Sequence, residues 1–297
     1  GGGILAKIAV ELEQAVARRM ASGAAGGTAG RLLAQGPGWV VEDVLCTSGP
    51  QDRPFDEQHC SVAIAIVAAG SFQYRSSTGH VLLTPGSLLL GNPGQYFECG
   101  HEHHTGDRCI SFRFQREYFE QTVADTGVKA GELQFTASRV PPVRPLSRWL
   151  ARACAGLTMQ QEVPWEEVSV QLAVTALQLS RGVTAGDCRL VRGAEARVTR
   201  VVRRIENGPG SDLTLQDLAR EAGLSPYHFL RTFEQVTGVT PHQYLLRARL
   251  RAAAMRLASE DTRVIDIAYG SGFGDLSNFN RAFRAEFGVS PRVYRRC

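Results

Sequence analysis

The sequence predicts an α+β protein of two domains, in which an antiparallel β-barrel or jelly roll with flanking helices precedes an all-helical domain. Its 297 residues exceed what one hydrophobic core usually organises. Short apolar runs of period two, punctuated by glycine and proline, fill the segment from Trp39 to Phe114. Helical periodicity returns after residue 144, and the last third contains an internal repeat.

The N-terminal segment predicts an amphipathic helix, because Leu5, Ile8 and Leu12 follow helical spacing. Charged residues interrupt its apolar face, so it lacks the continuous apolar stretch of a signal peptide. The Gly/Ala-rich stretch that follows predicts a flexible connector. We therefore assign residues 1–30 to a helix and connector that precede the first domain.

The cysteine pattern indicates whether the protein is secreted or stays in a reducing cellular compartment. Seven cysteines are an odd count, and none form a CxxC pair, which argues against a secreted disulfide framework. No apolar run reaches the ~18 residues of a membrane span. We expect a cytoplasmic protein that does not contact a membrane.

The predicted strands and the helices after them form one domain, residues 31–185. Alternation places Val62, Ile64 and Ile66 on one face, as it does Ile110, Phe112 and Phe114, and we expect these faces to line the barrel interior. Two predicted helices follow, in RPLSRWLARACAG and PWEEVSVQLAVTALQLSRG. This pair either forms a dimer surface or caps the barrel.

A polar, glycine-containing stretch, SRGVTAGDCRLVRGAE, marks the domain boundary, and the second domain covers residues 192–297. Residues 191–297 contain 17 arginines, no lysine and 11 acidic residues, a net charge of +6, whereas the rest of the chain carries −2. Clustered cations gain free energy by releasing phosphate counterions, so this basic third is the candidate to bind nucleic acid.

The basic segment contains two copies of one pattern. LTLQDLAREAGLSPYHFLRTFEQVTGVTPHQYL resembles TRVIDIAYGSGFGDLSNFNRAFRAEFGVSPRVYR. Six residues recur fifty positions later: Phe229, Arg231, Phe233, Gly238, Pro241 and Tyr244 return as Phe279, Arg281, Phe283, Gly288, Pro291 and Tyr294. The chain therefore predicts two related modules, joined by the helix PHQYLLRARLRAAAMRLASE.

Each copy predicts a helix-turn-helix. Gly223 suits the left-handed conformation that ends a first helix, and Ser225 with Pro226 starts a second one. Phe229 and Phe233, four residues apart, pack inward and direct the residues between them outward.

With these motifs in tandem, residues 197–296 resemble the DNA-binding domain of the AraC/XylS family of bacterial transcription regulators, most closely over GFGDLSNFNRAFRAEFGVSPRVYR. The region before them resembles the cupin-like effector domain of many members. The resemblance implies a regulator that binds double-stranded DNA, works with RNA polymerase, forms a homodimer and responds to an effector. Each chain would set two recognition helices into successive major-groove segments.

The position of each residue in the motif predicts which side chains reach DNA. Arg231 and Arg281 suit bidentate pairing with guanine, and Asn278 or Asn280 suits adenine. The alternative is that the repeated arginine contacts phosphate or braces its own module through an acidic neighbour. The predicted DNA-binding residues are Ser225, Tyr227, His228, Leu230, Arg231, Gln235, Leu276, Ser277, Asn278, Asn280 and Arg281.

Two further sites are predicted in the barrel region. The aromatic residues Phe72, Tyr74, Tyr96, Phe112 and Phe114 are candidates to line an effector pocket, with packed core as the alternative. CGHEHHTGDRC, from Cys99 to Cys109, is expected to be a hairpin loop. It is either structural, or a site for zinc or another soft metal formed by Cys99, His101, His103 and Cys109, or a redox pair of Cys99 and Cys109.

Two other function classes compete with an effector-controlled regulator. A cupin-type metalloenzyme with a basic domain is disfavoured, because HxHxxxD at His101, His103 and Asp107 comes too late in the chain for the first cupin motif. No nucleophile elbow, phosphate loop or paired-carboxylate motif occurs either, so we expect no enzyme, no catalytic residue and no certain cofactor. An architectural DNA binder without an effector is the third class.

Overall fold

The computed structural model describes residues 4–124, 133–158, 163–183 and 193–296. It confirms the α+β class, with an antiparallel β-sheet domain followed by a helical domain. The chain divides into two compact units. We call residues 10–141 and 162–189 the barrel unit, and residues 1–9, 142–161 and 190–297 the helical unit. The middle of the predicted boundary stretch, residues 184–192, lies outside the described residues.

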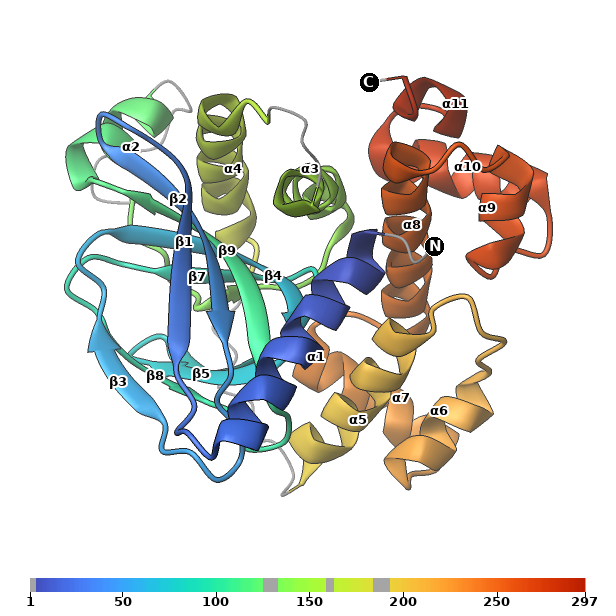
Figure 1. The fold of residues 1–297 in the computed structure, drawn as a ribbon, viewed down its shortest axis with the longest axis horizontal. Coiled ribbons are helices and arrows are strands. Elements are labelled where there is room, and N and C mark those ends of the chain that lie inside the picture. Colours follow the sequence, from blue (N-terminus) through green and yellow to red (C-terminus); the bar gives the residue numbers. More distant parts are fainter. Residues whose placement is uncertain (1–3, 125–132, 159–162, 184–192, 297) are drawn as a thin grey trace. The chain divides into compact units, whose positions relative to one another are not determined.

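Two antiparallel sheets form the barrel unit (Figure 1). The larger has the order β1-β2-β9-β4-β7-β10 and the smaller the order β3-β8-β5-β6. The larger sheet contains β1 (Thr28–Gly36), β2 (Trp39–Cys46), β9 (Asp107–Phe114), β4 (Val62–Gly70), β7 (Leu88–Gly91) and β10 (Arg139–Val140). The smaller contains β3 (Phe55–Gln58), β8 (Tyr96–Gly100), β5 (Phe72–Ser76) and β6 (Gly79–Leu83). β1 begins at Thr28, so the last residues of the predicted connector are strand.

The prediction of which face of β4 and β9 lines the barrel interior is wrong. Ala65 and Val67 of β4 and Cys109 of β9 pack with Tyr74 of the smaller sheet, so this face lies between the sheets. Val62, Ile64 and Ile66 pair with Phe114, Phe112 and Ile110 on the opposite face. Because β4 is buried on both faces, alternation along the strand does not tell which face is interior.

Helices cover that opposite face of the larger sheet. α2 (Arg116–Val123) contributes Phe119, which contacts Phe114, and Trp165 at the start of α4 (Trp165–Ser180) contacts Phe112. α4 contacts β1, β2 and β10, and its Val168 and Leu172 are fully buried. The predicted apolar stripe of α4 therefore packs within the barrel unit, and dimerisation through this helix stays a prediction.

The helix predicted at the N-terminus is confirmed as α1 (Ile4–Ser22). From residue 10 onward it belongs to the barrel unit, where Glu11 pairs with Arg108 at 2.6 Å and Arg19 pairs with Asp52 at 2.6 Å. Arg108 also bonds to Asp43 through two nitrogens, each at 2.9 Å. Burial raises the pKa of Asp43, but the hydrogen bonds and charges of Arg108 and Arg31 together outweigh it and hold that pKa below its usual value.

The helical unit confirms two modules around one long helix, α8 (Pro241–Ser259) (Figure 1). The first module contains α5 (Ala194–Asn207), α6 (Leu215–Ala222) and α7 (Pro226–Thr237). The second contains α9 (Val264–Gly270), α10 (Leu276–Phe287) and α11 (Pro291–Tyr294). Buried residues lie all round α8, among them Tyr244, Leu250 and Met255, because both modules pack against it.

The compact units and the sequence-based domains differ over residues 142–161. A short 3₁₀ turn, η3 (Arg144–Leu146), leads into α3 (Ser147–Thr158), which packs against α8 and α10. Ser147 donates to Glu286 of α10, and Arg247 of α8 lies 3.6 Å from the same carboxylate. These long-range polar contacts join α3 to the helical unit, and spacing along the sequence does not reveal them.

Gly223 allows a test of the predicted turn chemistry. Its φ of +64° is left-handed, and it follows α6 as expected. Gly223→Ala should destabilise the helical unit by ~1–2 kcal/mol, because a side chain at positive φ strains the backbone. Urea unfolding followed by circular dichroism measures this change.

Gly274 is the matched control, since it lies in the corresponding turn of the second module without positive φ and with open space around it. Gly274→Ala should change stability by less than about 0.5 kcal/mol. Equal effects of the two substitutions would contradict the assigned turn.

Candidate functional site

An aromatic cluster anchors the second helix of each module. Phe229 and Phe233 of α7 are fully buried, their ring centroids lie 5.5 Å apart, and Phe233 meets Tyr244 of α8 at 5.7 Å. In α10, Phe279 and Phe283 repeat the arrangement at 5.5 Å, and Phe283 meets Tyr294 at 5.3 Å. Because these rings fill the inner face, the outer face of each helix carries the side chains between them.

The start of each helix is capped by a side chain. The Ser225 hydroxyl accepts a hydrogen bond from the backbone N–H of His228, and the Asp275 carboxylate accepts one from that of Asn278 at 2.6 Å. Each cap satisfies an N–H that the helix leaves free. The caps fix where α7 and α10 begin and therefore which residues occupy their exposed first turns.

The predicted DNA-binding residues lie on these outer faces. Ten of the eleven are exposed: Ser225, Tyr227, His228, Leu230, Arg231, Gln235, Ser277, Asn278, Asn280 and Arg281. Leu276 is half-buried. Tyr227 is 63% exposed and Leu230 is 38% exposed, so both side chains are open to solvent on the outer face of α7.

Arg231 and Arg281 each contact a neighbour on their own helix. Arg231 donates to the Tyr227 hydroxyl at 3.4 Å, with its guanidinium carbon 5.9 Å from the centre of that ring. Arg281 donates to the Asn278 side-chain oxygen at 3.1 Å. Within the described residues neither arginine forms an ion pair, so the alternative in which an acidic neighbour holds the repeated arginine is not observed.

A basic hollow of about 850 Å³ on the second module was missed by sequence reasoning. Arg263, Arg292 and Arg296 line it together with Leu276 and Asn280 of the predicted recognition helix. These arginines come from the starts of α9 and α11 and from the chain end, so no local spacing connects them. The Arg-rich composition of the segment was the one available signal.

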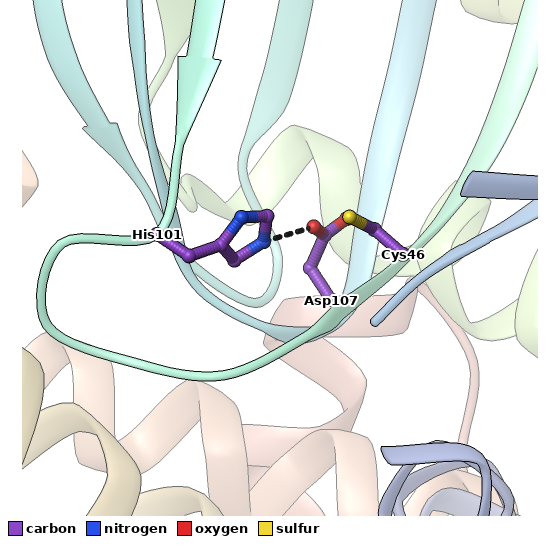
Figure 2. Close-up of side chains that lie close together, drawn as sticks. All are labelled: Cys46, His101 and Asp107. Carbon is purple, nitrogen blue, oxygen red and sulfur yellow. Dashed lines mark hydrogen bonds and ion pairs between the residues drawn. The ribbon is translucent and has the colours of Figure 1, made fainter. Parts of the chain in front are cut away.

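The barrel unit contains a buried cluster of Cys46, His101 and Asp107 (Figure 2). One ligand atom from each residue lies within 4.8 Å of the other two. His101 Nε2 donates to Asp107 Oδ1 at 2.7 Å, and the Cys109 thiol donates to Asp107 Oδ2 at 3.3 Å. Cys46 and Asp107 are direct partners across β2 and β9, which places their side chains on one face of the sheet.

Burial and charge shift the pKa values around this cluster. Burial lowers the pKa of His101, but hydrogen bonds and charge from Asp107 and Cys46 outweigh it and raise that pKa to about 9. Burial, together with the Asp107 charge, raises the pKa of both Cys99 and Cys109. His101 therefore favours the cationic form beside Asp107, and the Cys99 and Cys109 thiols favour the protonated form.

The structure does not bring the four predicted metal ligands together. Among the described residues, the potential metal ligands that lie close enough to share one ion are Cys46, His101 and Asp107. His101 is the one member of this group that was also a predicted ligand. Cys99 and Cys109 are both buried in the core cluster between the sheets. His103 lies on the partly exposed loop, where its Nε2 is 3.9 Å from Glu102. Cys46 was missed because it lies more than fifty residues away in sequence.

The five predicted pocket aromatics also lie in different environments. Phe72 and Tyr74 are buried between the sheets, whereas Tyr96 is 71% exposed. Phe112 and Phe114 pack on the opposite face of β9, against α4 and α2. The structure thus places no more than two of them on the interior face.

Two sequence profiles match the chain. A helix-turn-helix domain profile matches residues 218–297, and a profile of the AraC-like ligand binding domain matches residues 44–177. Transcriptional activator NphR of Rhodococcus is 36% identical over 146 residues, which is 48% of this chain and 42% of NphR. AarP of Providencia stuartii, an HTH-type transcriptional activator, is 32% identical over 98 residues, 33% of this chain and 73% of AarP.

The chain belongs to the AraC/XylS family of transcription regulators. RhaS of Klebsiella pneumoniae, another HTH-type transcriptional activator, is 37% identical over 101 residues, 34% of this chain and 36% of RhaS. The matches to NphR and RhaS thus span less than half the length of each. These AraC/XylS relatives are transcriptional activators and not enzymes.

Two solved structures are similar to the chain over different lengths. The DNA-binding domain of AdpA in complex with a target DNA is 29% identical, with 34% of this chain and 90% of that chain covered at a TM-score of 0.33. ToxT from Vibrio cholerae, bound to an unsaturated fatty acid, is 12% identical, with 88% of this chain and 96% of that chain covered at a TM-score of 0.36. None of the helices in the described residues has the length and apolar character needed to cross a membrane.

A second histidine in this AraC-like ligand-binding domain generates a pH prediction. His59 Nε2 lies 2.8 Å from the Tyr74 hydroxyl, and burial lowers the pKa of His59 from 6.5 to about 4. The unfolded chain therefore binds more protons than the folded chain between pH 6.5 and about 4. Stability should fall as the pH is lowered through this window, which urea unfolding at a series of pH values measures.

His59→Gln serves as the comparison because it removes the titrating group. The pKa of Asp43 and of Asp52 lies below 3.8, so these carboxylates lose their stabilising contribution at lower pH than His59 does. The variant should show a smaller loss of stability between pH 6.5 and 4 than the natural sequence. Identical pH profiles would contradict the assignment.

Proposed function

We propose that the chain is an effector-controlled transcription activator whose α7 and α10 read two successive major-groove segments on one side of a DNA duplex. The observation that carries this proposal is the duplicated packing of the two helices. The same pair of buried aromatic rings holds α7 and α10, and each helix has an exposed arginine at the repeated position. Major grooves on one side of B-DNA recur every ~34 Å, and the proposal requires α7 and α10 to be spaced to enter two of them.

Base reading is assigned to the exposed first turns of the two helices. Arg231 and Arg281 offer planar donor pairs that suit the two acceptors of guanine, and Asn278 or Asn280 suits adenine. The contact between Arg281 and Asn278 supports this assignment, since a neutral acceptor orients the guanidinium without neutralising it. Tyr227 supports Arg231 in the same way from one turn away.

Phosphate contact is assigned to the basic hollow. Arg292 and Arg296 line it beside Leu276 and Asn280 of the reading helix, so a backbone phosphate bound there would hold α10 at the groove. Arg263 has a weaker claim, because Asp266 already pairs with it at 2.8 Å. Phosphate contacts position a protein on DNA without selecting sequence.

The barrel unit is assigned the sensing role. It carries the match to the AraC-like ligand binding domain, and it buries a histidine, an aspartate and a thiol close to one another. We propose that it responds to a small molecule or a metal ion, that the chain acts as a homodimer in the cytoplasm, and that the bound dimer engages RNA polymerase. The free thiols of Cys46, Cys60, Cys99 and Cys109 support a reducing compartment.

Arg281→Ala tests the reading helix. A duplex selected from a random pool by the purified full chain serves as the probe, and a scrambled duplex of equal length serves as the reference. The substitution should weaken binding to the selected duplex by ~1–3 kcal/mol and relax the base preference at one position. Fluorescence anisotropy with both duplexes measures the affinity and the preference.

Arg292→Ala is the matched control for a phosphate contact. It should weaken binding to both duplexes alike and reduce the slope of log affinity against log salt by about 1. If Arg281→Ala also weakens both duplexes equally, Arg281 contacts phosphate and the reading assignment is wrong. If the full chain selects no duplex from the pool, the proposed DNA-reading function is wrong.

A further inference from the structure

We propose that Cys46, His101 and Asp107 form a binding site for a thiophilic divalent cation of the zinc type, and that this cation is the signal the barrel unit senses. The role of the cation as a signal rests on the proposed regulatory function. The binding site itself depends only on residues of the barrel unit.

The donor set matches the chemistry of zinc. The cluster offers one thiol, one imidazole and one carboxylate, which are the three side-chain types that bind Zn²⁺ in proteins. All three side chains are at least nine-tenths buried, at 3% exposure for Cys46, 5% for His101 and 6% for Asp107. Burial of three such groups around one point is costly unless they bind one another or a cation.

The three side chains come from three separate segments. Cys46 ends β2, His101 follows β8, and Asp107 begins β9. Figure 2 shows the imidazole and the thiol on either side of the Asp107 carboxylate. Convergence of side chains from three strand ends fixes the ligand positions through the sheet rather than through one flexible loop.

The separation between the His101 imidazole and the Asp107 carboxylate requires only a small adjustment for tetrahedral coordination. Ligand atoms at ~2.0–2.1 Å from a tetrahedral zinc ion lie about 3.3 Å from one another. His101 Nε2 and Asp107 Oδ1 lie 2.7 Å apart, so the imidazole and the carboxylate must separate by about 0.6 Å. Zinc would take the place of the Nε2 proton of His101 and the thiol proton of Cys46, and both protons leave to solvent.

A water molecule would supply the fourth ligand, as in zinc sites with three protein ligands. Cys109 lies outside the group, and its thiol donates to the second oxygen of Asp107 at 3.3 Å.

Tight packing connects the site to α1. Gly106, next to Asp107, has no room for a side chain, because an added Cβ would lie 2.8 Å from Val16 and 3.0 Å from Leu12 of that helix. On the other side of Asp107, Arg108 bonds to Glu11 of α1 at 2.6 Å. A shift of Asp107 on zinc binding therefore moves backbone that both contacts hold against α1, which is how occupancy would reach the rest of the protein.

The test uses the full chain, first treated with a chelator and then titrated with Zn²⁺ alone or Co²⁺ alone. We expect one zinc ion per chain by elemental analysis and a thiolate-to-cobalt charge-transfer absorption. Cys46→Ser should abolish that absorption, and His101→Gln and Asp107→Asn should each weaken zinc binding by at least about tenfold. His103→Ala and Cys60→Ser are the controls, and neither should change the affinity.

Several results would overturn the site. Zinc binding below one ion per chain would do so, as would binding that survives both Cys46→Ser and His101→Gln or that is lost in the two controls. Circular dichroism checks that each variant is folded. If the cluster variants do not fold, the cobalt spectrum of the natural sequence decides, because absence of the charge-transfer band means that no thiol binds the ion.

The sensing part is tested separately on the selected duplex. Zinc should change DNA affinity of the natural sequence at least about fivefold, as expected for a coupling free energy of about 1 kcal/mol, and should leave His101→Gln unaffected. Stoichiometric zinc binding with unchanged DNA affinity would overturn the sensing role. Failure of DNA binding without zinc and with zinc alike would instead overturn the regulatory function, while the cobalt spectrum would still report on the site.

Discussion

The helical unit depends on the burial of the aromatic rings behind α7 and α10. Phe229 and Phe233 in α7, and Phe279 and Phe283 in α10, are fully buried and fill the inner face of each helix. A helix anchored by rings four residues apart has one orientation about its own axis, so its outer face is fixed as well. The exposure of Arg231 and Arg281 follows from the position of these rings, and the paired DNA-reading function that we propose would be lost if either helix could rotate.

Strand β9 plays the equivalent role in the barrel unit, because it carries buried charge on both of its faces. Asp107 points between the sheets and bonds to His101 and Cys109, whereas Arg108 points to the opposite side and bonds to Asp43 and Glu11. Two adjacent buried charges of opposite sign, each with its own partners, hold the start of this strand firmly. Any ligand that displaces Asp107 would also disturb Arg108, and with it the contact to α1.

Local sequence was sufficient to predict the helix boundaries and the buried faces of the helical unit. The predicted helix start at Ser225, the left-handed Gly223 and the inward rings all depend on residues within a few positions of one another, and the structure confirms them. The basic hollow lined by Arg263, Arg292 and Arg296 could not be predicted, since it needs the packing of three separate segments. In the barrel, the strands were predicted but their interior face was not, because β4 is apolar and buried on both sides.

By itself the sequence determined the family, the class of fold, the duplicated helix-turn-helix pattern and the excess of arginine, because repeats, caps and helical periodicity are properties of neighbouring residues. The tertiary structure alone decided that Cys46 lies beside His101 and Asp107, that Phe112 and Phe114 pack under helices, and that α3 belongs to the helical unit. The physical reason is the register between β2 and β9, which places Cys46 opposite Asp107. Strand register is set by long-range pairing and burial, and no local pattern in either strand encodes it.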